Sequence, residues 1–127
     1  MSKILLVDDD PQVRKMLCMV LQREGYAVYE AGDGEAAIAV YKNEDIDLVI
    51  TDIVMPEKEG IGLIMELRNH DAKARIIAIS GGGRMDAGTY LKWAERLGVD
   101  ATFTKPVDRR ELLDSVVGLL ASKAVSC

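Results

Sequence analysis

Short aliphatic runs alternate with segments of helical periodicity along this 127-residue chain. The runs predict buried strands at residues 3–7, 26–31, 46–51, 76–79 and 101–104. The segments that follow them predict helices at residues 13–24, 33–43, 61–69, 84–97 and 108–123. Strands that are apolar on both faces need helices on both sides, so the pattern predicts an α/β fold with a five-stranded parallel sheet. Right-handed crossovers then give a doubly wound three-layer sandwich.

Local signals mark several of the predicted helix ends. Asp10 and Pro11 are suited to the N-cap and the first helical position, and Gly25 is typical of a helix C-terminus. Asp108 is the predicted cap of the last helix. The apolar face of the first helix is predicted to comprise Val13, Met16, Leu17, Val20 and Leu21.

The length fits a single domain over residues 1–127, and the composition narrows its partners. A net charge of −5 argues against a surface that binds the nucleic-acid backbone. The two cysteines, Cys18 and Cys127, lie far apart and follow no signal peptide, so we expect reduced thiols in a cytoplasmic protein. The first apolar run is too short for a membrane span or a signal sequence.

Polar side chains follow four of the predicted strands, at the point where each strand ends. They are Asp8, Asp9 and Asp10 after the first strand, Asp52 after the third, Ser80 after the fourth and Lys105 after the fifth. Ligands of doubly wound folds bind beyond the carboxyl ends of the strands, so these groups should converge. Clustered carboxylates repel one another and favour a hard cation, Mg²⁺ or Mn²⁺. A lysine and a hydroxyl facing them suit an anion, and one carboxylate could then act as a nucleophile that forms an acyl phosphate.

Each of these residues also has an ordinary structural interpretation. An aspartate after a strand is often a turn former or a helix cap, which is the role we assign to Asp10 because Pro11 follows it. Ser80, which precedes three glycines, is compatible with an ordinary loop residue, and Lys105 with a solvated surface lysine. The joint placement of these groups, after different buried strands, favours a functional site.

With these motifs in this order, the sequence resembles the receiver domain of two-component response regulators over essentially its whole length. The resemblance rests on ILLVDDD at residues 4–10, LVITDIVMP at 48–56 followed by Gly60, IAISG at 77–81, and KP at 105–106. It implies a flavodoxin-like sandwich with strand order 2-1-3-4-5. It also implies a signalling switch rather than a conventional enzyme, as a stand-alone or N-terminal receiver with no output domain in this chain.

The resemblance further implies a phosphoacceptor and a metal site. Asp52 would receive a phosphoryl group from the phosphohistidine of a sensor histidine kinase or phosphotransfer protein. Mg²⁺ would be bound by Asp9, Asp52 and the backbone carbonyl of Val54, with Asp8 reaching the ion through water. The phosphorylated domain would bind an unknown downstream protein through its fourth and fifth strand–helix units, as a monomer or a phosphorylation-linked homodimer.

The same resemblance assigns the switch residues. Ser80 and Lys105 would bind phosphoryl oxygens, and Pro106 would follow a cis peptide bond. Receiver domains usually carry an aromatic residue three positions before the lysine, whereas this chain has Thr102 there. The neighbouring Phe103 should point to the opposite face, into the core.

The loop after the fourth strand is glycine-rich and begins with Gly81 and Gly82. Both a simple connector and a loop that closes on the phosphoryl group are compatible with such a run. Neither Val54 nor Gly82 has a side chain that could activate an attacking water, so we expect autodephosphorylation to be slow to moderate.

Two alternatives remain at this point. One is a Mg²⁺-dependent phosphatase of the haloacid-dehalogenase type, with Asp8 as nucleophile and Asp10 as acid/base. It leaves Asp52 unexplained. The other is an interaction module that no longer accepts phosphate, against which the complete set of site residues argues.

Overall fold

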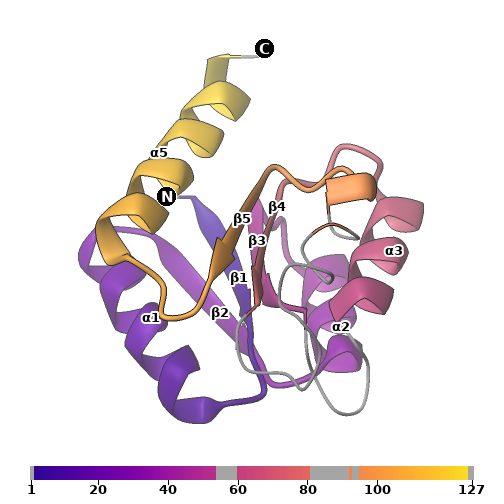
Figure 1. Cartoon of the computed structure of the whole chain (residues 1–127). Helices are drawn as coiled ribbons and strands as arrows, with labels where there is room; N and C mark the ends of the chain where they lie inside the picture. The colour runs from indigo at the N-terminus through magenta and orange to yellow at the C-terminus, as the bar shows by residue number, and fades with distance from the viewer. Residues whose placement is uncertain (1, 54–59, 81–91, 93–94, 126–127) are drawn as a thin grey trace.

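The computed structural model describes residues 2–53, 60–80, 92 and 95–125. One parallel sheet has the strand order β2-β1-β3-β4-β5, as predicted (Figure 1). Its strands are β1 Lys3–Val7, β2 Ala27–Ala31, β3 Leu48–Asp52, β4 Ile76–Ser80 and β5 Ala101–Thr104. The helices are α1 Pro11–Arg23, α2 Gly34–Asn43, α3 Gly60–His70 and α5 Arg109–Val125. The helix predicted at residues 84–97 falls largely outside the described residues.

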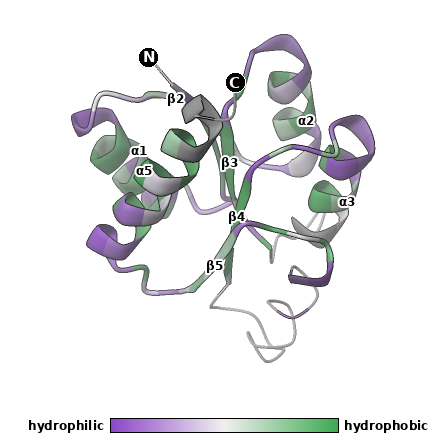
Figure 2. Ribbon diagram, turned by 90° about the horizontal axis from the view of Figure 1, so that it is seen from above, coloured by the Kyte–Doolittle hydropathy of each residue, from purple (hydrophilic) through white to green (hydrophobic). Residues whose placement is uncertain are grey.

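Helices cover both faces of the sheet, which gives the three layers expected from the sequence. Helices α1 and α5 lie on one face, and α2 and α3 lie on the other (Figure 2). Alternate residues of β1 enter the two cores, because successive side chains of a strand point to opposite faces. Ile4 packs with the core beneath α1 and α5, whereas Leu5 packs with the core beneath α2 and α3. All strands of the sheet's centre, β1, β3 and β4, are therefore apolar on both sides.

The predicted caps are confirmed at three helix ends. The Asp10 carboxylate accepts from the backbone N–H groups of Gln12 and Val13, and Asp108 accepts from the N–H of Glu111. Gly25 follows α1 with a φ of 91°, a conformation that favours glycine.

The predicted inner face of α1 is wrong at one position. Met16 is 41% exposed, and Cys18 takes its place beside Leu17 and Leu21 in the core. Successive helical residues are about 100° apart, so Met16 and Cys18 lie on opposite sides of Leu17. The sheet contacts the Cys18 side.

Strand register brings the strand ends to one edge of the sheet. Val7 lies opposite Thr51, Asp52 lies opposite Ile79, and Ser80 lies opposite Thr104. The residues that end or follow β1, β3, β4 and β5 are therefore neighbours in space.

Within the described part of the chain, no helix is long and apolar enough to cross a membrane.

Candidate functional site

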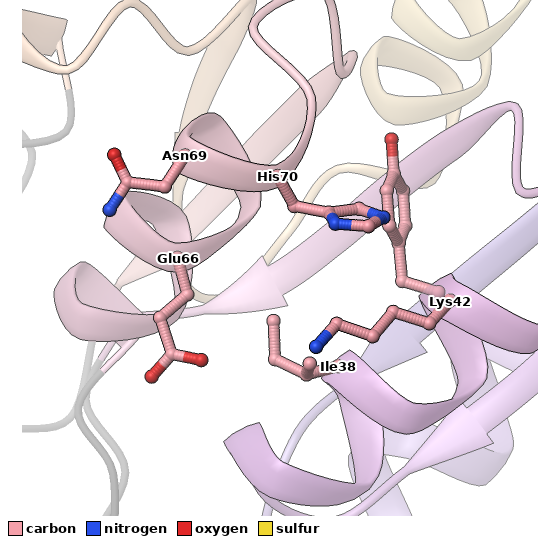
Figure 3. Close-up of a pocket in the computed structure, with 6 residues that line it drawn as sticks. Ile38, Lys42, Glu66, Asn69 and His70 are labelled. Carbon is pink, nitrogen blue, oxygen red and sulfur yellow. The ribbon is translucent and has the colours of Figure 1, made fainter.

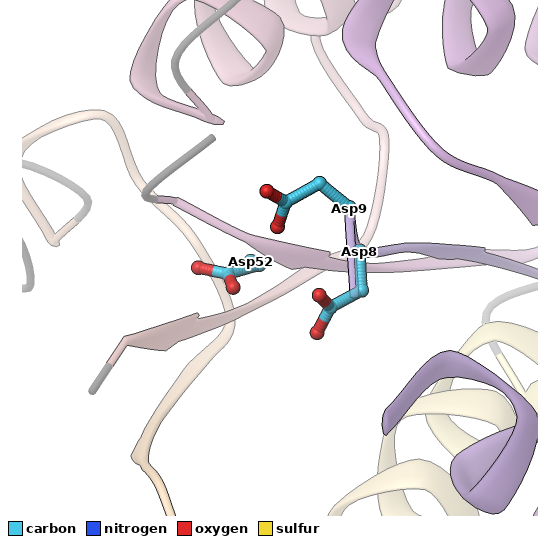
Figure 4. A group of neighbouring side chains, drawn as sticks. All are labelled: Asp8, Asp9 and Asp52. Atoms are coloured by element: carbon cyan, nitrogen blue, oxygen red, sulfur yellow. The ribbon is translucent and has the colours of Figure 1, made fainter. Parts of the chain in front are cut away.

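Three carboxylates meet beyond the ends of β1 and β3. Asp8, Asp9 and Asp52 each place a carboxylate oxygen within 4.8 Å of the others (Figure 4). Asp8 and Asp52 are 2% and 5% exposed, whereas Asp9 is open to solvent. The convergence predicted from the strand ends is thus observed for these three residues.

Asp8 is held by several hydrogen bonds. Its N–H donates to the carbonyl of Ala31 at 3.2 Å, and its Oδ1 accepts from the N–H of Asp10 at 2.9 Å. Asp10 itself uses Oδ1 to cap α1, so its carboxylate is committed to the helix backbone. This geometry gives no support to the phosphatase alternative, which needs Asp10 as an acid/base.

Lys105 reaches the carboxylates from the end of β5. Its Nζ donates to Asp52 Oδ2 at 2.8 Å and to Asp8 Oδ2 at 3.2 Å. Its backbone N–H donates to the carbonyl of Ser80 at 2.8 Å, and the bond to Pro106 is cis, as the resemblance implied. The solvated-lysine interpretation is therefore wrong, because the side chain is only 23% exposed and its ammonium group is paired with two carboxylates.

Burial and charge act in opposite directions on the proton affinities of this pair. Burial raises the pKa of Asp8, although the Asp10 N–H and the Lys105 charge partly offset it. Burial alone would lower the pKa of Lys105, but its hydrogen bonds and charge interactions with Asp52 and Asp8 outweigh that effect and raise the pKa. The ammonium group is thus the positive charge on which these buried carboxylates rely.

Ser80 supplies a buried hydroxyl at the end of β4. It is 1% exposed, and its Oγ has no hydrogen-bond partner among the described residues. A buried polar atom without a partner is uncommon, and a ligand oxygen would satisfy it. Thr51, which the sequence showed only as a strand residue, donates its hydroxyl to the Asp52 carbonyl at 2.9 Å.

The remaining predicted switch residues divide between described and undescribed parts of the chain. Thr102, on β5, lies opposite Ala78 of β4 and is half-buried. Phe103 packs against the core beneath α1 and α5, as predicted. The predictions for Val54, Gly81 and Gly82 fall outside the described residues.

The donor set at the carboxyl edge fits a hard divalent cation. Lys105 pairs with two of the three carboxylates, so the described residues of the cluster carry an excess of negative charge, and each carboxylate offers an oxygen as its ligand atom. Mg²⁺ prefers oxygen ligands and keeps several waters, which suits the solvent-exposed side at Asp9.

A separate hollow lies between α2 and α3, with a volume of about 280 Å³ (Figure 3). It is lined by Ile38, Tyr41, Lys42, Glu66, Asn69 and His70. Tyr41 donates to Asp71 Oδ2 at 3.0 Å, and its ring meets that of His70 edge-on. Crossover helices run antiparallel to the strands, so this end of α2 lies near the amino edge of the sheet, away from the carboxylates. We interpret it as a junction between the two helices.

Comparison with known proteins decides the family. The family model for the response regulator receiver domain matches residues 4–117. This chain belongs to the response regulator receiver domain family. The domain is 35% identical to the chemotaxis protein CheY of Halobacterium salinarum over 95% of this chain and 98% of that protein. It is 37% identical to the transcriptional regulatory protein CpxR of Klebsiella pneumoniae, over 94% of this chain but only 50% of that protein.

A solved structure gives the same assignment. The response regulator TrrA of Thermotoga maritima, in complex with Mg²⁺ and BeF, superimposes on this receiver domain with a TM-score of 0.80. The two are 32% identical, and the match covers 94% of this chain and 99% of that one. Receiver domains are the phosphoaccepting switches of two-component systems, so the predicted family, fold and general function are confirmed.

Proposed function

We propose that Asp52 accepts the phosphoryl group, from the phosphohistidine of a sensor histidine kinase or a phosphotransfer protein. The observation that supports this assignment most is the contact of 2.8 Å between Asp52 Oδ2 and Lys105 Nζ at a buried strand end. An Asp52 oxygen would attack phosphorus, the bond from phosphorus to the imidazole nitrogen would break, and the histidine would leave as neutral imidazole after taking up a proton. The product is an acyl phosphate.

Asp8, Asp9 and Asp52 would hold Mg²⁺, together with the backbone carbonyl of Val54. Bound there, the ion would neutralise charge on the transferring phosphoryl group. The three carboxylates within 4.8 Å support this assignment, and the Mg²⁺–BeF complex of TrrA is consistent with it. Asp9, on the solvent-exposed side, leaves room for the waters that Mg²⁺ retains.

Lys105 and Ser80 would bind the phosphoryl oxygens. Lys105 already contacts Asp52, and the Ser80 hydroxyl is buried with no partner among the described residues. The new oxygens would draw both groups, which lie at the ends of β4 and β5. The resulting shift would alter the surface that a downstream protein binds.

Intact mass spectrometry tests the acceptor. After incubation with a small phosphodonor and Mg²⁺, the wild-type protein should gain one phosphoryl group, and the Asp52→Asn variant should gain none. Asp10→Asn is the matched control, because this carboxylate caps α1 and should be dispensable for phosphorylation. An adduct that persists on Asp52→Asn would place the acceptor elsewhere. Absence of an adduct on the wild-type protein would favour the interaction module.

A further inference from the structure

Arg14, in the first turn of α1, turns its guanidinium group back toward the end of β1. Its Nη1 donates to the backbone carbonyl of Asp8 at 2.8 Å, and its Nε donates to Glu30 Oε1 at 3.1 Å. The Arg14 side chain is 23% exposed, so most of its surface is covered by the protein. One side chain thereby connects α1, the end of β1 and strand β2.

The carbonyl that Arg14 contacts belongs to the peptide group between Asp8 and Asp9. On the other side of the same residue, the Asp8 N–H donates to the Ala31 carbonyl at 3.2 Å. A peptide group is planar, so a bond to its oxygen fixes the direction in which the chain enters Asp9. Asp9 is exposed, and its surroundings restrain it less than those of the buried Asp8.

We propose that Arg14 is a positioning residue for the metal site, one that orients the Asp8–Asp9 peptide and so keeps the Asp9 carboxylate within the cluster. The inference rests on the proposed function, because it names a residue that orders the same Mg²⁺ site. Glu30 balances the charge of Arg14 at 3.1 Å, so the contribution is geometric rather than a change in net charge.

Gly32 lies next to the Arg14 guanidinium and offers a second way to disturb its contact with Asp8. A Cβ atom at position 32 would come within 3.2 Å of Arg14 Nη1, the same nitrogen that donates to Asp8. The backbone of Gly32 does not have a positive φ. An alanine would therefore leave the main chain unstrained while it pushes the donor by a few tenths of an ångström.

The test measures Mg²⁺ affinity by calorimetry in Arg14→Met, Arg14→Lys and Gly32→Ala variants. Loss of an orienting partner of a metal ligand weakens metal binding by roughly 10- to 100-fold, and we expect the Mg²⁺ affinity of Arg14→Met to be about tenfold lower than that of wild type. Arg14→Lys should resemble Arg14→Met, because lysine carries one nitrogen at the end of its chain and lacks the separate Nε and Nη1 donors that reach Glu30 and the Asp8 carbonyl. Lys3→Met is the matched control, since Lys3 pairs with Glu44 at the other end of β1.

Gly32→Ala separates positioning from stability. An alanine that adopts the native backbone restricts the unfolded chain, so the unfolding midpoint should be unchanged or raised. Mg²⁺ affinity should nevertheless fall, by less than in Arg14→Met, because the donor is displaced and not removed. In metal-free protein, Arg14→Met should also speed amide exchange at Asp10, whose N–H donates to Asp8 Oδ1. At saturating Mg²⁺, the phosphorylation rate of Arg14→Met should return to near the wild-type rate.

Three outcomes would overturn the inference. The first is a wild-type Mg²⁺ affinity in both Arg14→Met and Gly32→Ala. The second is full affinity in Arg14→Lys with weak binding in Arg14→Met, which would indicate charge instead of geometry. The third is an equal loss in Lys3→Met. In all three, wild-type protein binds Mg²⁺ and forms the adduct, so the proposed function survives. A wild-type protein that binds no Mg²⁺ would overturn both.

Discussion

Replacing Lys105 with methionine should reveal how far the buried carboxylates depend on one cation. The contacts of Nζ at 2.8 and 3.2 Å correspond to about 6 and 5 kcal/mol of Coulomb attraction at an effective dielectric constant of about 20. Desolvation of the three groups offsets most of this attraction. Removing one partner of a buried pair still costs about 3–5 kcal/mol, and we expect about 3 kcal/mol because the Lys105 side chain is 23% exposed.

Urea denaturation of Lys105→Met and wild type, in chelator at pH 7, measures this loss in the free energy of unfolding. In a thermal melt under the same conditions, the melting temperature should fall by about 10 °C. Lys105 and Mg²⁺ neutralise the same carboxylates, so the variant should bind Mg²⁺ more tightly than the wild-type protein. Ligand binding at 100 times the Kd stabilises by about 2.7 kcal/mol, so adding Mg²⁺ should narrow the stability gap. A variant as stable as wild type in chelator, or a gap that Mg²⁺ leaves unchanged, would refute Lys105 as the counter-ion.

The pH dependence of the same gap follows from the two raised pKa values. Lys105 has a folded pKa above 10.5, so its stabilising effect is present below 10.5 and is lost as the pH rises through the folded pKa. The folded protein binds a proton at Asp8 more tightly than the unfolded chain does, so protonation favours folding as the pH falls through the raised pKa of Asp8. Protonation also removes a negative charge that Lys105 balances, so wild type gains less than Lys105→Met and the gap narrows. The gap should therefore be widest near neutral pH and narrow at both ends.

Three further predictions concern neighbouring residues. Asp8→Asn should raise the metal-free stability by about 1 kcal/mol, because a buried carboxylate with a raised pKa is replaced by a neutral isostere, and calorimetry should show at least tenfold weaker Mg²⁺ binding. Asp10→Ala should cost about 1 kcal/mol in urea denaturation through loss of the α1 cap, while Mg²⁺ affinity stays at the wild-type value. Leu63→Ala, in the core beneath α3, should cost about 3 kcal/mol by the same measurement and leave the phosphoryl adduct intact.

The fold and the acidic site were predictable because they depend on local patterns that topology converts into proximity. The runs at 48–50 and 76–79 are apolar on both faces, which favours central strands of a parallel sheet. Once the strands are parallel, a residue that follows one strand must lie beside a residue that follows its neighbour. Asp8, Asp52 and Lys105 therefore converge without further information.

The contacts that escaped prediction are those of side chains with several possible targets. In the sequence Arg14 looks like an ordinary exposed helix residue, and no spacing indicates that its guanidinium reaches the backbone carbonyl of Asp8, just after β1. Thr51 has the β-branched character of many strand residues, and its hydroxyl bond depends on the direction of the Asp52 carbonyl, which the sequence does not indicate. Met16 and Cys18 are both apolar and flank Leu17, so the sequence does not indicate which of the two sides of α1 packs on the sheet.

The contacts at Ser80 and Lys105 also bear on how a receiver without the usual aromatic residue at position 102 could report phosphorylation. Lys105 is already paired with two carboxylates, so binding a phosphoryl oxygen would exchange one charged partner for another and would change the free energy little. The Ser80 hydroxyl has no partner among the described residues, so it would gain a whole hydrogen bond to a charged acceptor, which is typically about 1.5–3 kcal/mol. The Ser80 carbonyl accepts from the Lys105 N–H at 2.8 Å, so any movement of Ser80 is transmitted to the end of β5. In this proposal, the energy of the switch comes from Ser80 and reaches β5 through the backbone, with no role required for a large ring at Thr102.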